Sequence, residues 1–274
     1  MAPRPLIIGH RGASALAPEN TISAFKRALA DGADGFEFDV RLTCDAVPVV
    51  IHDATFTRTG NNPAEVSALT VEQCQRIEVG AWFNSKFPLL ARPEFEHENL
   101  PTLDHVLNVF SKTTAILYLE MKCEGPDWSD LARAVVELVK RYSLSDRTVI
   151  ESFHLPSLAA VKRVDQLVRT SALFQPSIRR PLSSLRLASM IESAHDLGAN
   201  EVALHYTLVN RRTVSVAERL EMPCVVWTVD SPRWMLRATR LGLKGVITNN
   251  PAIMVNAAEV AQETRSTDCI DHTD

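Results

Sequence analysis

The 274-residue chain has no apolar run long enough to cross a lipid bilayer. A transmembrane helix needs about 20 consecutive, mostly apolar residues, whereas the longest apolar runs here have the length of a β-strand. The apolar run before His10 is also shorter than the core of a signal peptide, and no small-residue cleavage site follows it. We therefore expect no membrane span, no export signal and a cytoplasmic location.

The chain also has no cysteine pattern that would indicate a disulfide framework or a zinc site. It contains five cysteines, an odd number, and no Cys-x-x-Cys pair. Both features argue against stable disulfides and against the paired ligand spacing of structural zinc. The five are expected to be reduced thiols: Cys44, Cys74, Cys123, Cys224 and Cys269.

An excess of positive charge is missing as well. The chain has 29 Lys and Arg residues against 33 Asp and Glu residues, a formal net charge of −4. This balance gives no electrostatic reason to expect nucleic acid or an anionic membrane as a partner. Hydrophobic residues make up 46% of the chain and charged residues 23%, so a large core can form.

Short apolar runs alternate with amphipathic helical patterns along the chain. The helical patterns include Thr21–Ala30, Trp128–Tyr142, Pro181–Leu197 and Pro232–Leu241. Glycines stand where several of these helices should end, in the left-handed conformation that closes a helix: Gly32, Gly198 and Gly242. The predicted strands are Leu6–Gly9, Gly35–Leu42, Pro48–His52, Ala115–Lys122, Thr148–Phe153, Thr170–Phe174, Glu201–His205, Cys224–Val229 and Gly245–Thr248. Repeated βα units predict a parallel sheet, and this many predict one α/β domain over residues 1–274, a TIM-like (β/α)8 barrel.

Three segments depart from this repeat. The turn around Cys44–Ala46 is too short for a helix, so the crossover helix between the second and third strands is missing. Residues 54–99 hold no clear βα unit and are expected to form an insertion with one helix, Thr70–Val79. The polar segment from about 257 to 274 is expected to be a helix that frays into a flexible tail. Because a barrel has eight strands, one of the nine candidates must lie outside it or be a wrong assignment.

Ionisable residues cluster at the ends of four predicted strands. In a parallel barrel the carboxyl ends of the strands form one rim, and the active site lies there. Side chains two residues apart on a strand point to the same side, so the polar members of each motif project together, while Phe38 and Met121 face the helices. The four motifs are His10-Arg11-Gly12, Glu37-Phe38-Asp39, His52-Asp53 and Glu120-Met121-Lys122.

Three of these residues are carboxylates: Glu37, Asp39 and Glu120. Carboxylates that converge in a barrel mouth repel one another unless a cation lies among them. Ligands that are all oxygen suit a hard ion, Mg2+ or Ca2+, better than zinc. We therefore expect one divalent cation, and the residues leave the choice between these two ions open.

The other residues at the rim supply proton transfer and positive charge. His10 and His52 titrate near neutral pH and can accept and donate a proton. Arg11 and Lys122 suit a phosphate. Each residue alone has an ordinary structural explanation, but a folding requirement would not place so many polar groups at the ends of separate buried strands.

Motifs along nearly the whole chain resemble the glycerophosphodiester phosphodiesterase family, and they occur in the family's order. They are His10-Arg11-Gly12, Pro18-Glu19-Asn20-Thr21, Glu37-Phe38-Asp39, Leu42–Asp45, Val50-Ile51-His52-Asp53, Arg58-Thr59, Gly80-Ala81-Trp82-Phe83, Leu100-Pro101-Thr102-Leu103, Leu119-Glu120-Met121-Lys122, Glu151-Ser152-Phe153, Val226-Trp227-Thr228-Val229 and Gly245-Val246-Ile247-Thr248. The resemblance implies a TIM-like barrel whose short second connection and whose insertion after the third strand account for the departures above. Coverage of this extent is far more specific than any single motif.

The resemblance also implies a role for each residue at the rim. His10 and His52 are similar to the family's acid–base pair, and Glu37, Asp39 and Glu120 to its metal ligands. Arg11 and Lys122 resemble its phosphate contacts, and Trp227 resembles a wall for the glycerol moiety. One position departs from the pattern: the family usually ends with Thr-Asp-x-Pro, whereas this chain has Thr248-Asn249-Asn250-Pro251.

The implied reaction is metal-dependent hydrolysis of a glycerophosphodiester to glycerol 3-phosphate and an alcohol such as choline or ethanolamine. The nucleophile is either water or the glycerol 2-hydroxyl, and the sequence does not assign the base and the acid between the two histidines. Two alternatives stay open: a related lipid-acting barrel enzyme of the phospholipase D or C type, and a non-catalytic phosphate-binding barrel.

Overall fold

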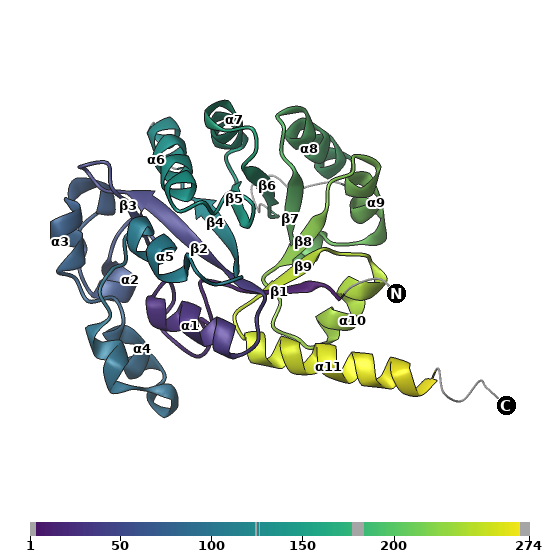
Figure 1. Cartoon of the computed structure of the whole chain (residues 1–274), viewed down its shortest axis with the longest axis horizontal. Helices are drawn as coiled ribbons and strands as arrows, with labels where there is room; N and C mark the ends of the chain where they lie inside the picture. The colour runs from purple at the N-terminus through teal and green to yellow at the C-terminus, as the bar shows by residue number, and fades with distance from the viewer. Residues whose placement is uncertain (1–3, 124, 126, 177–183, 269–274) are drawn as a thin grey trace.

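Eight parallel strands close into a barrel in the computed structural model, which describes residues 4–123, 125, 127–176 and 184–268. The first barrel strand pairs with both the second and the last, so the sheet has no open edge at this point. This confirms the predicted TIM-like barrel (Figure 1). The barrel strands are β1 (Leu6–Gly9), β2 (Gly35–Leu42), β4 (Ile116–Met121), β5 (Thr148–Ser152), β6 (Arg169–Phe174), β7 (Glu201–His205), β8 (Cys224–Trp227) and β9 (Gly245–Thr248).

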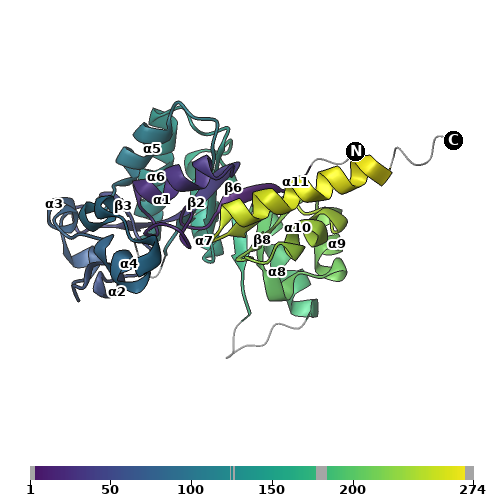
Figure 2. The same cartoon turned by 90° about the horizontal axis from the view of Figure 1, so that it is seen from below.

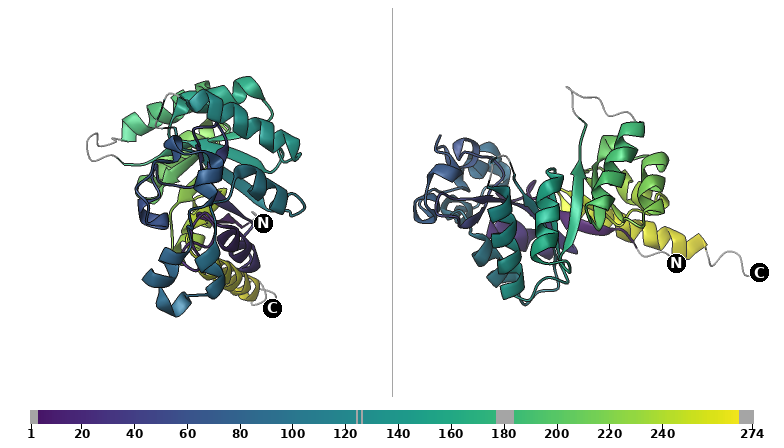
Figure 3. Two further views of the ribbon diagram at one scale, coloured as in Figure 1. Left: turned by 90° about the vertical axis from the view of Figure 1, so that its left-hand side faces the viewer. Right: turned by 90° about the horizontal axis from the view of Figure 1, so that it is seen from above.

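Helices between the strands cover the outside of the barrel (Figures 1 and 3). Thr21 begins the first of them by accepting a hydrogen bond from the backbone of Ala24. The three predicted glycines adopt φ values of 85°, 85° and 66° where α1, α8 and α10 end. The covering helices are α1 (Ile22–Ala30), α5 (Leu103–Phe110), α6 (Trp128–Arg141), α7 (Leu155–Val164), α8 (Ser184–Asp196), α9 (Arg211–Arg219), α10 (Arg233–Arg240) and α11 (Pro251–Asp268), with a 3-10 turn η4 (Tyr206–Leu208) before α9. Residues 181–183 of the predicted helix Pro181–Leu197 lie outside the described residues.

The main core lies between the strands and this helical layer. Phe38 is fully buried there, and its ring centroid lies 5.6 Å from that of Phe25 on α1. Met121 is buried in the same layer. The predicted outward orientation of Phe38 and Met121 is therefore confirmed, and it leaves the polar residues beside them facing into the barrel.

The one predicted strand that lies outside the barrel is β3 (Pro48–Val50), which pairs antiparallel with the end of β2. The reason is the short turn that precedes it: a parallel return would need a crossover of a dozen or more residues. Val40 of β2 pairs with Val50, so the chain leaves the rim along β2 and returns to it along β3. This hairpin brings His52 back to the mouth of the barrel.

The segment after β3 forms a group of short helices beside the barrel, with a small core of its own (Figures 1 and 2). The expectation of one helix over Thr70–Val79 was wrong, because the helix there ends at Gln75 and Val79 instead donates a hydrogen bond to Glu98. The short elements are α2 (Thr57–Gly60), η1 (Val66–Ala68), α3 (Val71–Gln75), α4 (Ala81–Lys86), η2 (Pro88–Leu90) and η3 (Pro93–His97).

The last helix, α11, packs against α10 and β1 on the outside of the barrel (Figure 2). It continues to Asp268, so much of the segment for which a flexible tail was expected is helical, and residues 269–274 lie outside the described residues. None of the helices in the described ranges has the length and apolar character of a membrane span. The four cysteines in those ranges, Cys44, Cys74, Cys123 and Cys224, carry no disulfide.

Candidate active site

A cavity of about 530 Å3 opens at the carboxyl ends of the barrel strands. Seven of the eight predicted site residues line it, and Asp39 lies directly beside it in contact with Lys122. The seven are His10, Arg11, Glu37, His52, Glu120, Lys122 and Trp227. The fold thus brings together residues that are up to 217 positions apart in the sequence (227 − 10).

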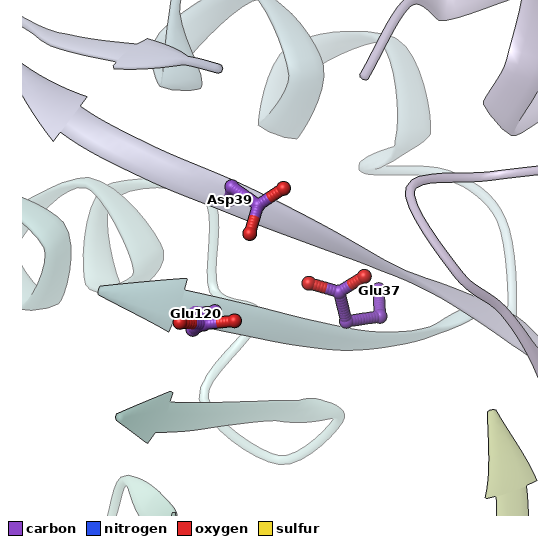
Figure 4. A group of neighbouring side chains, drawn as sticks. All are labelled: Glu37, Asp39 and Glu120. Carbon is purple, nitrogen blue, oxygen red and sulfur yellow. The ribbon is translucent and has the colours of Figure 1, made fainter. Parts of the chain in front are cut away.

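Three carboxylates lie on two adjacent strands at one side of this cavity (Figure 4). Asp39 of β2 stands opposite Glu120 of β4 in the register of the parallel pair, and Glu37 lies two residues before Asp39. One oxygen from each of the three groups lies within 4.8 Å of the others. All three residues are buried, so their charges are removed from most of the solvent.

Two cationic side chains partly neutralise these carboxylates. The Lys122 ammonium lies 2.6 Å from Glu120 Oε1 and 2.8 Å from Asp39 Oδ1. Arg11 Nε lies 3.2 Å from Asp39 Oδ2. Three ionised carboxylates against two cations leave one negative charge in a buried place, which is unfavourable unless it is protonated or paired.

The pKa values of the carboxyl groups reflect this imbalance. Burial and the charges of Asp39 and Glu120 raise the pKa of Glu37 well above its ordinary value. Burial raises the pKa of Glu120 to about 7, against the opposing effect of Lys122. For Asp39, burial also acts to raise the pKa, but Lys122 and Arg11 outweigh it and the net direction is downward.

These groups fit a hard divalent cation. The carboxyl oxygen Oε1 of Glu37 is buried and has no hydrogen-bond partner. Asp39 is held from its other side, because Asn20 Nδ2 donates to Oδ2 at 2.8 Å. An oxygen-only donor set with a residual negative charge and an unpartnered oxygen is the environment that Mg2+ or Ca2+ prefers.

His10 follows β1 and is held through its Nδ1 atom. Nδ1 lies 2.7 Å from Oδ1 of Asn249, and Asn249 Nδ2 donates to Asp230 Oδ2 at 2.7 Å. Because a carboxylate can only accept, the amide nitrogen of Asn249 must face Asp230, so its oxygen accepts from His10. Nε2 is then the acceptor nitrogen, and it lies 3.9 Å from Glu37 Oε2. Burial, together with the charge of Arg11, lowers the pKa of His10 to about 4.

His52 follows the β2–β3 hairpin and is held in the same manner. Its Nδ1 atom lies 2.6 Å from Oδ1 of Asp53. A carboxylate accepts and does not donate, so Nδ1 carries the proton and Nε2 is left as an acceptor. Burial is the main cause that lowers the pKa of His52. Both imidazoles therefore present an unprotonated Nε2 atom at neutral pH.

Apolar and aromatic side chains form another part of the cavity wall, with Trp227 among them. Trp227 Nε1 donates to the carbonyl of Ala203 at 3.2 Å, and its ring centroid lies 5.6 Å from that of Phe153. Val225 and Trp227 face the barrel interior, as strand alternation predicts. The strand predicted over Cys224–Val229 is shorter than expected: β8 ends at Trp227, and Val229 packs in the outer core.

Several residues at the site had no assigned role in the sequence interpretation. Glu151 lines the cavity, is buried, and pairs in register with Glu120; burial and the nearby acidic groups raise its pKa well above the ordinary value. Its alternation with Val149 could have placed it inside the barrel. Asp53 and Asp230 lie in loops and Arg58 lies in the four-residue helix α2, where no periodic signal shows what they contact.

Comparisons with known proteins point to one enzyme family. The model of the glycerophosphoryl diester phosphodiesterase family matches residues 10–253. A glycerophosphodiester phosphodiesterase of Caldanaerobacter subterraneus is 32% identical over 254 residues, covering 92% of this chain and 97% of the relative.

Solved structures are similar over nearly their full length. A glycerophosphodiester phosphodiesterase from Parabacteroides distasonis has a TM-score of 0.75 and 26% identity, covering 95% of this chain and 100% of that one. A phosphodiesterase from Oleispira antarctica, solved with the product sn-glycerol-3-phosphate, has a TM-score of 0.81 and 24% identity, covering 93% and 97%. At that identity the second likeness concerns the fold alone.

Proposed function

Because the chain belongs to the glycerophosphoryl diester phosphodiesterase family, we propose that it hydrolyses glycerophosphodiesters with one divalent cation and two histidines. The observation that carries this proposal is what one cavity brings together: two oriented imidazoles and an aromatic wall line it, and a cluster of three carboxylates lies at its side. The products are glycerol 3-phosphate and an alcohol. The Caldanaerobacter subterraneus relative, a glycerophosphodiester phosphodiesterase that is 32% identical over 254 residues, supports this substrate class.

Glu37, Asp39 and Glu120 would hold the cation. When bound there, Mg2+ or Ca2+ supplies positive charge that stabilises the charge developing on the phosphate. Arg11 and Lys122 contribute to the same stabilisation from side chains already fixed against the carboxylates.

Proton transfer falls to His10 and His52. Each is fixed by a hydrogen bond at Nδ1 and presents Nε2 to the cavity. One imidazole takes the proton of the attacking hydroxyl, from water or from the glycerol 2-position, and the other protonates the departing alcohol. The negative phosphate, once bound beside both rings, favours the protonated form that the acid needs.

The aromatic side of the cavity receives the glycerol moiety. Trp227 is held in place by its hydrogen bond to Ala203 and by contact with Phe153. A flat apolar wall opposite a charged cluster suits a substrate that is charged at phosphorus and uncharged along its carbon chain.

A release assay tests the proposal. The purified chain is incubated with glycerophosphocholine or glycerophosphoethanolamine, with Mg2+ or Ca2+ and with EDTA, and glycerol 3-phosphate is measured. We expect release with the cation and none after chelation. Full activity after exhaustive chelation contradicts the cation's role. In a parallel incubation with lysophosphatidylcholine, release of choline or phosphocholine without any glycerol 3-phosphate from glycerophosphocholine would favour the lipid-acting alternative. Binding of glycerol 3-phosphate without turnover would favour a binding protein.

A further inference from the structure

Arg58 lies in α2, at the start of the insertion, and its guanidinium contacts two acidic residues at once. Nη1 and Nη2 donate to the two carboxylate oxygens of Glu19 at 2.6 and 2.8 Å. Nε donates to Asp53 Oδ2 at 2.7 Å. All three nitrogens of the guanidinium are therefore used, in the forked geometry that distinguishes arginine from lysine.

The contact with Asp53 leads to His52. Asp53 accepts from Arg58 with one oxygen and from His52 Nδ1 with the other, at 2.6 Å. The Asp53 side chain is 29% exposed, so without Arg58 it could turn towards water and release the ring. The guanidinium thus fixes the carboxylate that fixes the imidazole.

The contact with Glu19 leads to Arg11 and the carboxylate cluster. Glu19 Oε1 accepts from Arg58 Nη2 and also from Arg11 Nη1, the latter at 2.8 Å. Arg11 in turn lies 3.2 Å from Asp39. One side chain of the insertion is therefore connected, through one intermediate residue in each direction, to His52 and to Arg11.

We propose that Arg58 is a positioning residue for catalysis, which orients His52 through Asp53 and Arg11 through Glu19. The inference rests on the proposed function, because it concerns the same site. The insertion lies beside the barrel, and through Arg58 it would take part in orienting the catalytic residues. The cation–π contact of Arg58 with Trp82, at 5.9 Å, joins the guanidinium to α4 within the insertion.

A purely structural role for Arg58 is the alternative. Its side chain is 42% exposed, and ion pairs of that exposure contribute little to folding stability. A structural role predicts that substitution lowers the melting temperature and leaves kcat of the folded enzyme unchanged. A positioning role predicts a lower kcat and a melting temperature close to that of the wild type.

The test compares Arg58→Gln and Arg58→Lys with a matched control, Arg76→Gln. Arg76 pairs with Glu72 at 2.5 Å in the same insertion, but both residues are exposed and neither contacts the cavity. For each variant, kcat and KM for glycerophosphocholine are measured with saturating cation, at a temperature well below every melting transition. We expect Arg58→Gln to lower kcat about 10–100-fold, the usual effect of losing a group that orients a ligand or catalytic side chain, with a smaller change in KM. Arg58→Lys should recover part of the loss, and Arg76→Gln should stay within about twofold of wild type.

A second background identifies the route. With Glu19→Gln and Asp53→Asn already present, Arg58→Gln should lower kcat by less than about twofold, because both connections are weakened beforehand. A wild-type kcat in Arg58→Gln, or an equal fold-loss in both backgrounds, would overturn the proposal. If Arg58→Gln does not fold, Arg58→Lys decides, since a wild-type kcat there has the same consequence. A wild-type protein that releases no glycerol 3-phosphate contradicts the proposed function instead, so the two failures are distinguishable.

Discussion

Replacing Asn249 by aspartate, the residue that the family pattern usually has there, should destabilise this protein. Asn249 Nδ2 donates to Asp230 Oδ2 at 2.7 Å, and the Asn249 backbone donates to Asp230 Oδ1 at 2.8 Å. Asn249→Asp replaces the donor nitrogen by an acceptor oxygen and places two carboxylates against each other. The backbone contact holds Asp230 in place, so it cannot simply turn away.

The magnitude follows from the distance and the exposure. Two unit charges about 3 Å apart repel by about 1.4 kcal/mol in water and by about 5.5 kcal/mol at an effective dielectric constant of about 20. Asp230 is exposed and Asn249 half-buried, so the repulsion lies towards the lower figure. With the lost hydrogen bond to a charged group included, we expect a loss of about 2–4 kcal/mol in the free energy of unfolding at pH 7. For a chain of this size that is about 4–10 °C in melting temperature.

The loss should depend on pH, with a sign that follows from the repulsion. In the folded variant the carboxyl pair holds a proton more tightly than in the unfolded chain, so the destabilisation grows as pH rises through the ordinary carboxyl range. It should shrink as pH falls towards about 4, where one group is protonated in both states. Chemical unfolding of wild type and variant at several pH values measures this difference.

The control exchanges the two residues. Asn249→Asp with Asp230→Asn restores one donor and one acceptor across the same 2.7 Å contact, and it should recover most of the stability. It also places a carboxylate directly against Nδ1 of His10. An Asn249→Asp variant as stable as wild type at pH 7, or an exchanged pair no better than the single variant, would refute the reasoning.

Four further substitutions test the site itself. Glu120→Gln should lower activity at least about 100-fold through loss of a cation ligand. It should leave the melting temperature equal or higher, because it removes a buried carboxyl group whose pKa is raised to about 7. A large fall in melting temperature would contradict this. His10→Ala and His52→Ala should each lower kcat about 10²–10⁴-fold. A substrate with a p-nitrophenol leaving group, which departs without a proton, should rescue one variant far more than the other. Equal rescue would contradict the assignment of one histidine as base and the other as acid. Trp227→Ala should raise KM for glycerophosphodiesters and leave bis(p-nitrophenyl) phosphate nearly unaffected; equal losses on both substrates, with a large drop in stability, would make Trp227 a core residue only.

The barrel itself could be predicted because its signals are local. Each βα unit shows a short apolar run, an amphipathic helix and a glycine at the helix end, and these features need no knowledge of distant contacts. The position of β3 could not be predicted in the same way. Its apolar residues read like those of any barrel strand, and only the shortness of the turn before it indicates the antiparallel return.

His52 shows how a correct position can follow from an incomplete argument. It was placed at the rim because the carboxyl ends of parallel barrel strands meet there. The strand before it is antiparallel and outside the barrel, and His52 reaches the rim because the hairpin turns back towards it.

The partners of the site residues were mostly beyond prediction. Asn249 was recognisable as a departure from the family pattern, but Asp230, 19 residues earlier in a different loop, gave no sign that it accepts from that amide. Arg58 and Glu19 are 39 residues apart and belong to different elements. Contacts of this kind depend on how loops pack against one another at the rim, and neither the hydrophobic periodicity nor the helix-capping residues predict that packing.

The division between strands and loops has a consequence for how the site works. The three carboxylates stand on β2 and β4 and are fixed by the barrel, so the geometry offered to a cation is as rigid as the sheet. The two imidazoles stand just beyond strand ends, and side chains from other segments orient them. Such loop positions adjust more easily than strand positions.

Substitutions in the barrel wall at the carboxylates should therefore act mainly on cation affinity, whereas substitutions at Asn249, Asp53 or Arg58 should act mainly on kcat at saturating cation. Isothermal titration with Mg2+ or Ca2+ measures the cation affinity of each variant, and comparison with kcat for the same variants separates the two effects. If Asp53→Asn loses as much cation affinity as Glu120→Gln, strand and loop residues do not differ in this way.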